Sequence, residues 1–188
     1  MALRVIGIDP GLTRCGIGVV DVRPNREAAL VHYGVIRSAT DADIEQRLLT
    51  ISNGIAEMLD SFEPQAVAVE RVFAQHNLRT VMGTAQVSGI ALASAAARGL
   101  RVGLHTPSEV KASITGYGSA EKKQVATMVA RILKLAEPPT PADAADALAL
   151  ALCHAWRVGS TVTAEGRPGQ TPAQRAWQAA EKAARRRS

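Results

Sequence analysis

The sequence predicts a single α/β domain in which a five-stranded mixed sheet is flanked by helices. Three apolar runs near the N-terminus, separated by short turns, are typical of an antiparallel meander. Farther along, helical spacing alternates with short apolar runs, which favours strands joined by helical crossovers. The chain has 188 residues, of which 47% are hydrophobic and 21% charged, so it can bury one core and is not a wholly disordered polymer.

The first half of the chain supplies four strands and one long helix. Apolar residues recur every three or four positions between Ile44 and Phe62, which predicts a helix with one buried face. Ser38 or Thr40 is expected to cap its N-terminus. The fourth strand is continuously apolar, as strands buried on both faces are, and it delivers Glu70 at its end. The predicted strands are Leu3–Ile8, Gly16–Val20, Ala29–Ile36 and Ala66–Val69.

The second half supplies a fifth strand, Val102–His105, and four helices. The first of these helices is rich in alanine and stops at Gly99, a residue type common just after a helix. Thr106 and Glu109, with proline between them, form the pattern of a capping box. The predicted helices are Asn77–Ala97, 107–114, Ala120–Leu135 and Ala142–Trp156.

The composition changes after the last of these helices. We therefore divide the chain into a domain at residues 1–157 and a basic, flexible tail at residues 158–188. Residues 157–188 carry a net charge of +5, whereas residues 1–156 are neutral. A tail of this charge either holds phosphate backbones without sequence choice or only solubilises the end of the chain.

The sequence favours a protein of the cytoplasm. No uninterrupted apolar run reaches the roughly 18 residues of a membrane span, and Asp9 interrupts the apolar stretch that a signal peptide would need. Cys15 and Cys153 form no CxxC motif, so buried, reduced thiols are expected. The histidines show no metal-ligand spacing and are expected to be structural or at the surface: His32, His76, His105 and His154.

Four carboxylates occupy positions where a lone negative charge is costly. Asp9 and Glu70 each end an apolar strand, while Asp143 and Asp146 lie three residues apart on one face of the last predicted helix. If the four converge, their repulsion requires a cation between them, and Mg²⁺ prefers oxygen ligands. Two such ions can hold the attacking and leaving oxygens of a phosphodiester displacement.

Each acid also has a structural interpretation. Asp9 precedes Pro10 and Gly11, which is common turn chemistry, and Asp143 suits the first turn of a helix. Asp146 fits this interpretation less well, because it lies on a markedly apolar helix. Convergence of the four acids is therefore an expectation that the structure must test.

Four segments, taken in order, resemble the RuvC family of bacterial Holliday-junction resolvases. They are IGIDPGLTRCG, VAVERVFAQHN, GSAEKKQV and PADAADALALA, and the similarity extends from Val5 to about Trp156. The resemblance implies a ribonuclease-H-like fold. It also implies a homodimer that makes paired nicks in four-way junction DNA with two Mg²⁺ ions per active site, or with Mn²⁺ in their place.

The resemblance also implies roles for individual residues. Some members of the family carry histidine where this chain has Asp143. Phe73 is implied to be a wedge that stacks on a base, although its sequence position also suits a core anchor. Arg71, His76 and Ser119 are expected to contact DNA. The resemblance implies that the metal-binding catalytic acids are Asp9, Glu70, Asp143 and Asp146. It also implies that Lys111 and Lys122 lie beside the scissile phosphate, although their sequence positions alone suit solvated helix lysines.

Partners and rival functions follow from the same segments. The resemblance implies cooperation with the RuvA–RuvB branch-migration complex and action at the nucleoid. The helix Asn77–Ala97 is a candidate dimer interface, with burial against its own sheet as the alternative.

A sugar-kinase or actin-like ATPase also begins with a strand and an Asp-Gly turn, but it needs a second domain. A nuclease-like relative that acts on RNA would lack the Phe73 loop, and a catalytically silent DNA-binding module would lack one of the acids.

Overall fold

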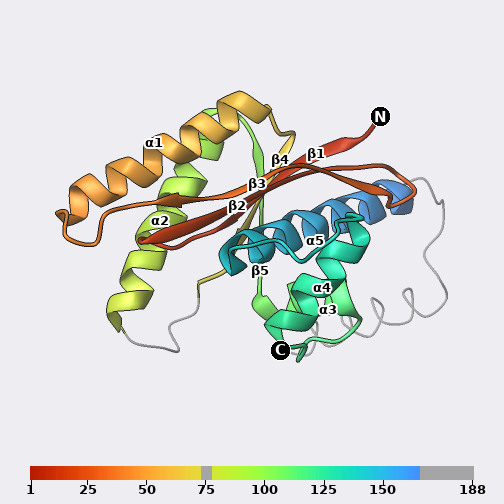
Figure 1. Ribbon diagram of the computed structural model, residues 1–188. Helices are drawn as coiled ribbons and strands as arrows, with labels where there is room; N and C mark the ends of the chain where they lie inside the picture. The colour runs from red at the N-terminus through yellow and green to blue at the C-terminus, as the bar shows by residue number, and fades with distance from the viewer. Residues whose placement is uncertain (73–77, 166–188) are drawn as a thin grey trace, which may run out of the picture. The chain divides into compact units, whose positions relative to one another are not determined.

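A computed structural model describes residues 1–72 and 78–165, with side chains for residues 1–72 and 81–158 (Figure 1). Phe73, His76 and Asn77 lie outside the described residues, as does the tail after Glu165. The chain divides into the units Met1–Arg157 and Val158–Ser188. Among the described residues, no helix is both long and apolar enough to cross a membrane.

Five strands form one mixed sheet in the order β3-β2-β1-β4-β5. The first three strands pair antiparallel, whereas β4 runs parallel to β1 and β5 runs parallel to β4. This order and these directions define a ribonuclease-H-like sheet, so the predicted fold class and its N-terminal meander are confirmed. The strands are β1 (Leu3–Asp9), β2 (Arg14–Val22), β3 (Ala28–Arg37), β4 (Ala66–Glu70) and β5 (Arg101–His105).

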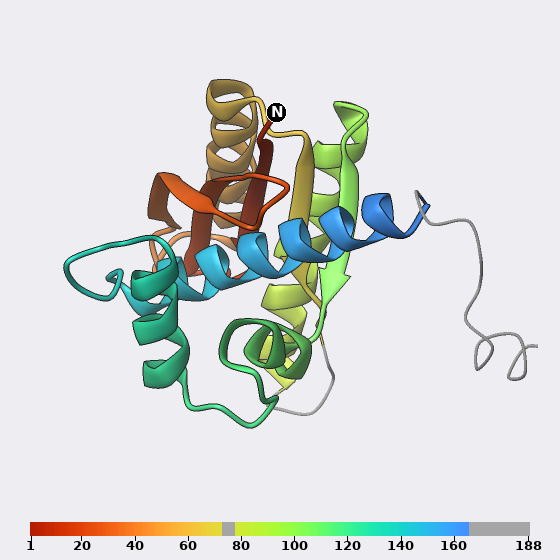
Figure 2. The ribbon, with the colours of Figure 1, turned by 90° about the vertical axis from the view of Figure 1, so that its right-hand side faces the viewer.

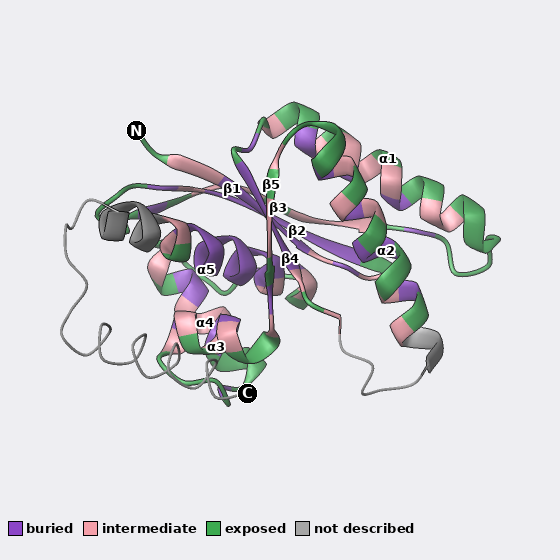
Figure 3. Cartoon of the chain, turned by 180° about the vertical axis from the view of Figure 1, so that it is seen from behind, coloured by how far each residue is buried: buried purple, intermediate pink, exposed green. Residues whose placement is uncertain are grey.

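Helices cover both faces of the sheet (Figures 1 and 2). Ile6 and Ile8 of β1 pack in one apolar cluster with the first two helices, whereas Val5 packs in a second cluster with the last three. Because side chains alternate along a strand, the two clusters lie on opposite faces, and Figure 3 shows the buried strands between them. The helices are α1 (Ile44–Phe62), α2 (Leu78–Ala97), α3 (Pro107–Thr115), α4 (Lys122–Ile132) and α5 (Ala142–Glu165).

Glycines in the two central strands determine how closely α5 approaches the sheet. A Cβ atom on Gly7 or Gly16 would overlap the carbonyl oxygen of Ala147 or Asp143, respectively. A Cβ on Gly18 would lie 2.6 Å from the backbone nitrogen of Leu148. The missing side chains thus form a shallow track in which the α5 backbone lies directly on β1 and β2. This contact places the first turns of α5 beside the end of β1.

The predicted buried face of α1 is confirmed, but its predicted cap is wrong. Asp43 is the residue at the N-cap position, and its side chain makes no capping hydrogen bond. Ser38 instead donates from Oγ to the carbonyl oxygen of Leu12 (2.5 Å) and accepts from Nε of Arg47 (3.1 Å). Ser38 therefore ties the β1–β2 loop to α1, a long-range role that local spacing does not reveal.

The helices after β5 follow the prediction except that α4 is shorter than predicted and α5 is longer. The expected capping box at α3 is present: Thr106 N donates to Glu109 Oε2 (2.8 Å), and Glu109 N donates to Thr106 Oγ1 (3.2 Å). α5 was expected to stop at Trp156 but continues to Glu165. The sequence between these positions contains no proline, and Gly159 alone weakens a helix without ending it.

Candidate active site

Asp9 and Glu70 are neighbours because two adjacent parallel strands end together. Asp9 is the last residue of β1 and Glu70 is the last residue of β4. The register pairs Ile8 with Val69, so the next residue of each strand is one of the two acids. Strands of this kind carry functional groups at their carboxyl ends, and both carboxylates lie at that edge of the sheet.

Asp143 and Asp146 reach the same edge from α5. They lie in its first two turns, three residues apart, so they share one face of the helix. Gly16 pairs with Asp9 in the β1–β2 register, and it is also the glycine that receives the Asp143 backbone. Each carboxylate side chain is 22% exposed. The glycine track therefore holds both acids near Asp9 while leaving them partly open to solvent.

The charges of neighbouring acids affect the ionisation of Asp9 and Glu70. Burial, reinforced by the charges of Glu70, Asp146 and Asp143, raises the pKa of Asp9 from 3.8 to about 7. Burial and the charge of Asp146 also raise the pKa of Glu70. A carboxyl group that is hard to ionise beside other carboxylates marks a place where a positive charge is missing.

Two basic side chains lie on the α5 acids. Nζ of Lys122, at the start of α4, is 2.7 Å from Oδ2 of Asp146. Nη2 of Arg14, at the start of β2, is 2.9 Å from Oδ2 of Asp143. Lys111 of α3 also acts on the cluster, because its charge lowers the pKa of Glu70. The predicted lysines thus lie near the acids, whereas Arg14 was not predicted.

The donor set suits a hard divalent cation. All four side chains offer carboxylate oxygens, the ligands that Mg²⁺ and Mn²⁺ favour. Oδ2 of Asp143 is buried and has no hydrogen bond of acceptable geometry, although Arg14 is close to it. Within the described part of the chain, no three acidic, histidine or cysteine side chains are gathered tightly enough to enclose one ion. As described, the acids form a charged cluster, with Arg14 and Lys122 partly neutralising it.

Of the remaining residues predicted to contact DNA, the structure describes some and not others. Arg71 directly follows Glu70 and is exposed, with its backbone N–H donating to the carbonyl oxygen of His105 (2.8 Å). Ser119 is exposed in the turn before α4. Phe73 and His76, which lie outside the described residues, remain predictions.

Two histidines that are distant in the sequence contact each other in the core. Nε2 of His105 and Nδ1 of His154 are 3.0 Å apart, and both residues are buried. Burial lowers the pKa of both rings, that of His154 to about 4. Neutral, buried rings suit the structural role expected for them. Cys15 and Cys153 are also buried and unpaired, as expected.

A sequence model of the family described as crossover junction endodeoxyribonuclease RuvC matches residues 5–154. The chain belongs to the RuvC family. A RuvC from Leifsonia xyli is 63% identical over 200 aligned positions that cover 100% of this chain and 96% of that protein. A RuvC from Thermobifida fusca is 64% identical over 155 positions, covering 82% of this chain and 85% of that protein.

Solved structures agree with this membership. The structure of Thermus thermophilus RuvC in complex with a Holliday junction substrate superposes with a TM-score of 0.80 at 37% identity, covering 85% of this chain and 96% of that one. The yeast mitochondrial Holliday junction resolvase Ydc2 shares the fold, with a TM-score of 0.59 at 12% identity. Membership of the RuvC family makes the chain an endodeoxyribonuclease that depends on divalent metal, and it decides against the ATPase alternative.

Proposed function

We propose that this RuvC protein resolves four-way DNA junctions by hydrolysing one phosphodiester in each of two opposing strands. The observation that supports this most strongly is the cluster of Asp9, Glu70 and the α5 acids, in which burial and mutual repulsion raise the pKa of Asp9 to about 7. The junction as substrate follows from the complex of the Thermus relative, which aligns over nearly its full length.

The four carboxylates are proposed to hold two Mg²⁺ ions, with Mn²⁺ as a substitute. When bound there, the ions supply positive charge at the attacking and leaving oxygens of the phosphodiester. Asp9 must give up its proton for this role, and its raised pKa means that part of the metal-free protein carries that proton at neutral pH. Burial of Asp9 strengthens its charge interactions with the other acids of the cluster.

Lys122 and Lys111 are proposed to stabilise the scissile phosphate. The hydrogen bond to Asp146 raises the pKa of Lys122, so the ammonium group stays protonated at neutral pH. Its side chain is 75% exposed, so it is free to turn from Asp146 toward a phosphate oxygen. Water attacks phosphorus and releases a proton to solvent, while the bond to the 3′ oxygen breaks and that oxygen takes up a proton from solvent. The products then carry a 5′-phosphate and a 3′-hydroxyl.

Contacts outside the cluster are proposed to select the junction. Arg71 is exposed beside Glu70 and is therefore within reach of the strand that the acids cut. Ser119, His76 and the wedge Phe73 are further proposed contacts. Stacking of one base on an aromatic ring contributes about 1–3 kcal/mol.

A homodimer is proposed because paired nicks require two active sites related by two-fold symmetry. α2 is the candidate helix for the contact between the two copies. One of its faces packs on its own sheet through Val87, Ala91 and Ala95, which was the alternative for this helix. Its opposite face is exposed and presents Met82 together with small residues at helical spacing, of which Gly89 has nothing within 4 Å of an added Cβ. This exposed face is the proposed contact with the second copy.

The chain is further proposed to act in the cytoplasm at the nucleoid, where its DNA substrate lies, together with RuvA–RuvB. The division at residues 157/158 is proposed to separate a nuclease domain from a basic tail that adds affinity for any DNA. Both proposals extend the junction-cutting activity and depend on it.

The function is tested with three labelled DNAs of equal length: a four-way junction, a linear duplex and a single strand. We expect nicks in the junction alone, symmetric in opposing strands, in Mg²⁺ or Mn²⁺ and none in EDTA. The nicked products should be sealed by DNA ligase, and added ATP should change nothing. Equal cutting of the duplex, or nicks that ligase cannot seal, would contradict the proposal.

A further inference from the structure

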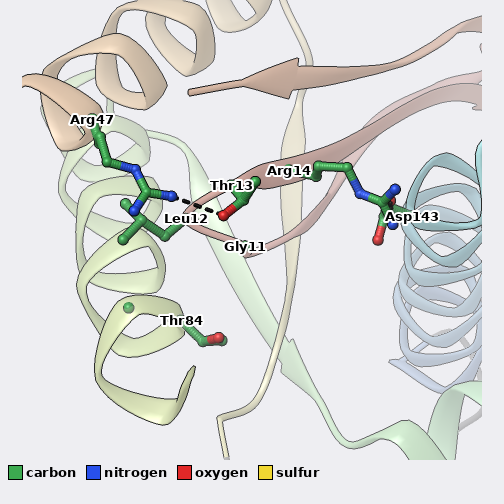
Figure 4. Close-up of a pocket in the computed structure, with 8 residues that line it drawn as sticks. Gly11, Leu12, Thr13, Arg14, Arg47, Thr84 and Asp143 are labelled. Carbon is green, nitrogen blue, oxygen red and sulfur yellow. Dashed lines mark hydrogen bonds and ion pairs between the residues drawn. The ribbon is translucent and has the colours of Figure 1, made fainter. Parts of the chain in front are cut away.

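A pocket of about 410 Å³ adjoins the acid cluster but extends away from it. Its lining comes from the β1–β2 loop, the start of β2, α1, α2 and the start of α5. Figure 4 shows Arg47 reaching Thr13 on one side of the pocket and Arg14 pointing to Asp143 on the other. The polar lining residues are Thr13, Arg14, Arg47, Thr84 and Asp143.

Arg47 is held firmly in this pocket. Its Nε donates to Oγ of Ser38 (3.1 Å), and its Nη2 donates to Oγ1 of Thr13 (2.8 Å; Figure 4). Ser38 is itself buried and fixed by its bond to Leu12. A guanidinium carries five N–H donors, and the other donors of Arg47 bond to no residue that the structure describes. The pocket therefore contains an oriented cation whose remaining donors are not used by the described residues.

Arg14 is the second cation of the pocket, and the carboxylate that it pairs with also belongs to the acid cluster. It pairs with Asp143, which is one of the four proposed metal ligands. When Asp143 binds a metal ion, its ion pair with Arg14 becomes weaker, because the metal ion then neutralises the same carboxylate charge. The side chain of Arg14 is 48% exposed, so it is free to turn into the pocket. Loading of the active site thus leaves two arginines facing the pocket without a matching anion.

We propose that this pocket binds a backbone phosphate of the junction strand, one that flanks the scissile phosphate. Arg47 is its fixed cation, and Arg14 is a second cation that moves from Asp143 to the phosphate. The hydroxyl of Thr84 completes the site as a neutral donor from α2. Guanidinium groups match phosphate geometry, and contacts of this kind fix the register of a nucleic acid. The inference rests on the proposed function and adds a subsite that sets which bond reaches the acids.

The test replaces single phosphates of the cut strand by neutral methylphosphonates and measures junction binding. Binding is followed by fluorescence anisotropy in Ca²⁺, at several salt concentrations. With the wild-type protein, we expect one substituted position beside the scissile bond to weaken binding by about tenfold. With Arg47→Met, the unmodified junction should bind about tenfold more weakly, and the penalty at that one position should disappear. The salt slope should fall by roughly 1.

Two further variants keep the test decisive if Arg47→Met fails to fold. Arg14→Met removes the mobile cation and Thr84→Val removes only a hydroxyl group, and both should reduce the penalty at the same position. Arg23→Met is the matched control, because Arg23 follows β2 at the end of the sheet opposite Arg14. It should keep the wild-type penalties at every position.

The possible outcomes separate this subsite from the proposed nuclease activity. Identical penalty profiles for wild type, Arg14→Met and Thr84→Val would overturn the subsite, even if all three proteins cut junctions. Absence of cutting by the wild type would overturn the proposed function, whatever the binding profile shows.

Discussion

Replacing Asp9 by asparagine should stabilise the metal-free protein at neutral pH. The folded-state pKa of Asp9 is about 7, against an ordinary value of 3.8. The folded protein therefore retains a proton that the unfolded chain has released. The contribution of Asp9 to wild-type stability consequently falls as pH rises from about 4 to about 7, and it stays low above that range. A difference of about three pKa units corresponds to about 4 kcal/mol, which is the largest gain a neutral side chain of this shape can give.

The assay is urea unfolding followed by circular dichroism in EDTA, at several pH values from 4.5 to 8. Wild type and Asp9→Asn share every other titrating group, so their difference isolates Asp9. We expect a small difference at pH 4.5 that grows to between about 2 and 4 kcal/mol at pH 8. Added Mg²⁺ should stabilise the wild type more than the variant, because ligand binding to the folded state adds stability.

The control is Asp60→Asn. Asp60 is an exposed acid of α1 that pairs with Arg98, and the hydrogen bond from Arg98 lowers its pKa. Neutralising it should give no gain at pH 8. If Asp9→Asn is no more stable than wild type at pH 8, burial and the neighbouring carboxylates do not disfavour the ionised form of Asp9, and the reasoning is refuted.

Three other predictions follow from the same structure. His154→Gln should flatten the acid side of the stability profile. The pKa of His154 is about 4 instead of 6.5, so protonation of this residue costs the wild type up to about 3 kcal/mol of stability as pH falls through that range. A variant profile as steep as that of the wild type would contradict this. Gly16→Ala should cost about 1–3 kcal/mol and reduce nicking because it pushes Asp143 away, whereas Gly34→Ala, with only His32 Nε2 at 3.5 Å, should have little effect on either. Truncation after Glu165 removes a net charge of +5 and should weaken junction and duplex binding equally while lowering the salt slope by roughly 4 to 5; an unchanged slope would mean that the tail does not touch DNA.

The sequence was most informative where a signal is local. Apolar spacing predicted α1, and the pattern Thr106-Pro107-Ser108-Glu109 predicted a capping box that the structure contains. The end of α5 was misjudged because no strong stop signal lies near Trp156. The role of Ser38 was misjudged because its partners, Leu12 and Arg47, are distant in sequence or belong to another element.

The candidate site shows the same limit. The chain positions of Asp9 and Glu70 predicted two acids at strand ends, and the parallel register of β1 and β4 brings them together. The pairing of Arg14 with Asp143 depends on how closely α5 lies on β2, and the glycines at positions 16 and 18 are the hints to this in the sequence of that strand. The contact between His105 and His154 likewise arises from the packing of β5 against α5.

The central claim is that four carboxylates form one centre that cuts four-way junctions. It is tested most directly by measuring nicking and binding of the same junction by Asp9→Asn, Glu70→Gln, Asp143→Asn and Asp146→Asn at saturating protein in Mg²⁺. We predict that all four variants bind the junction at least as well as wild type, because each loses a negative charge facing phosphate, and that none of them cuts it. Strong residual nicking by Asp9→Asn or Glu70→Gln would contradict the claim.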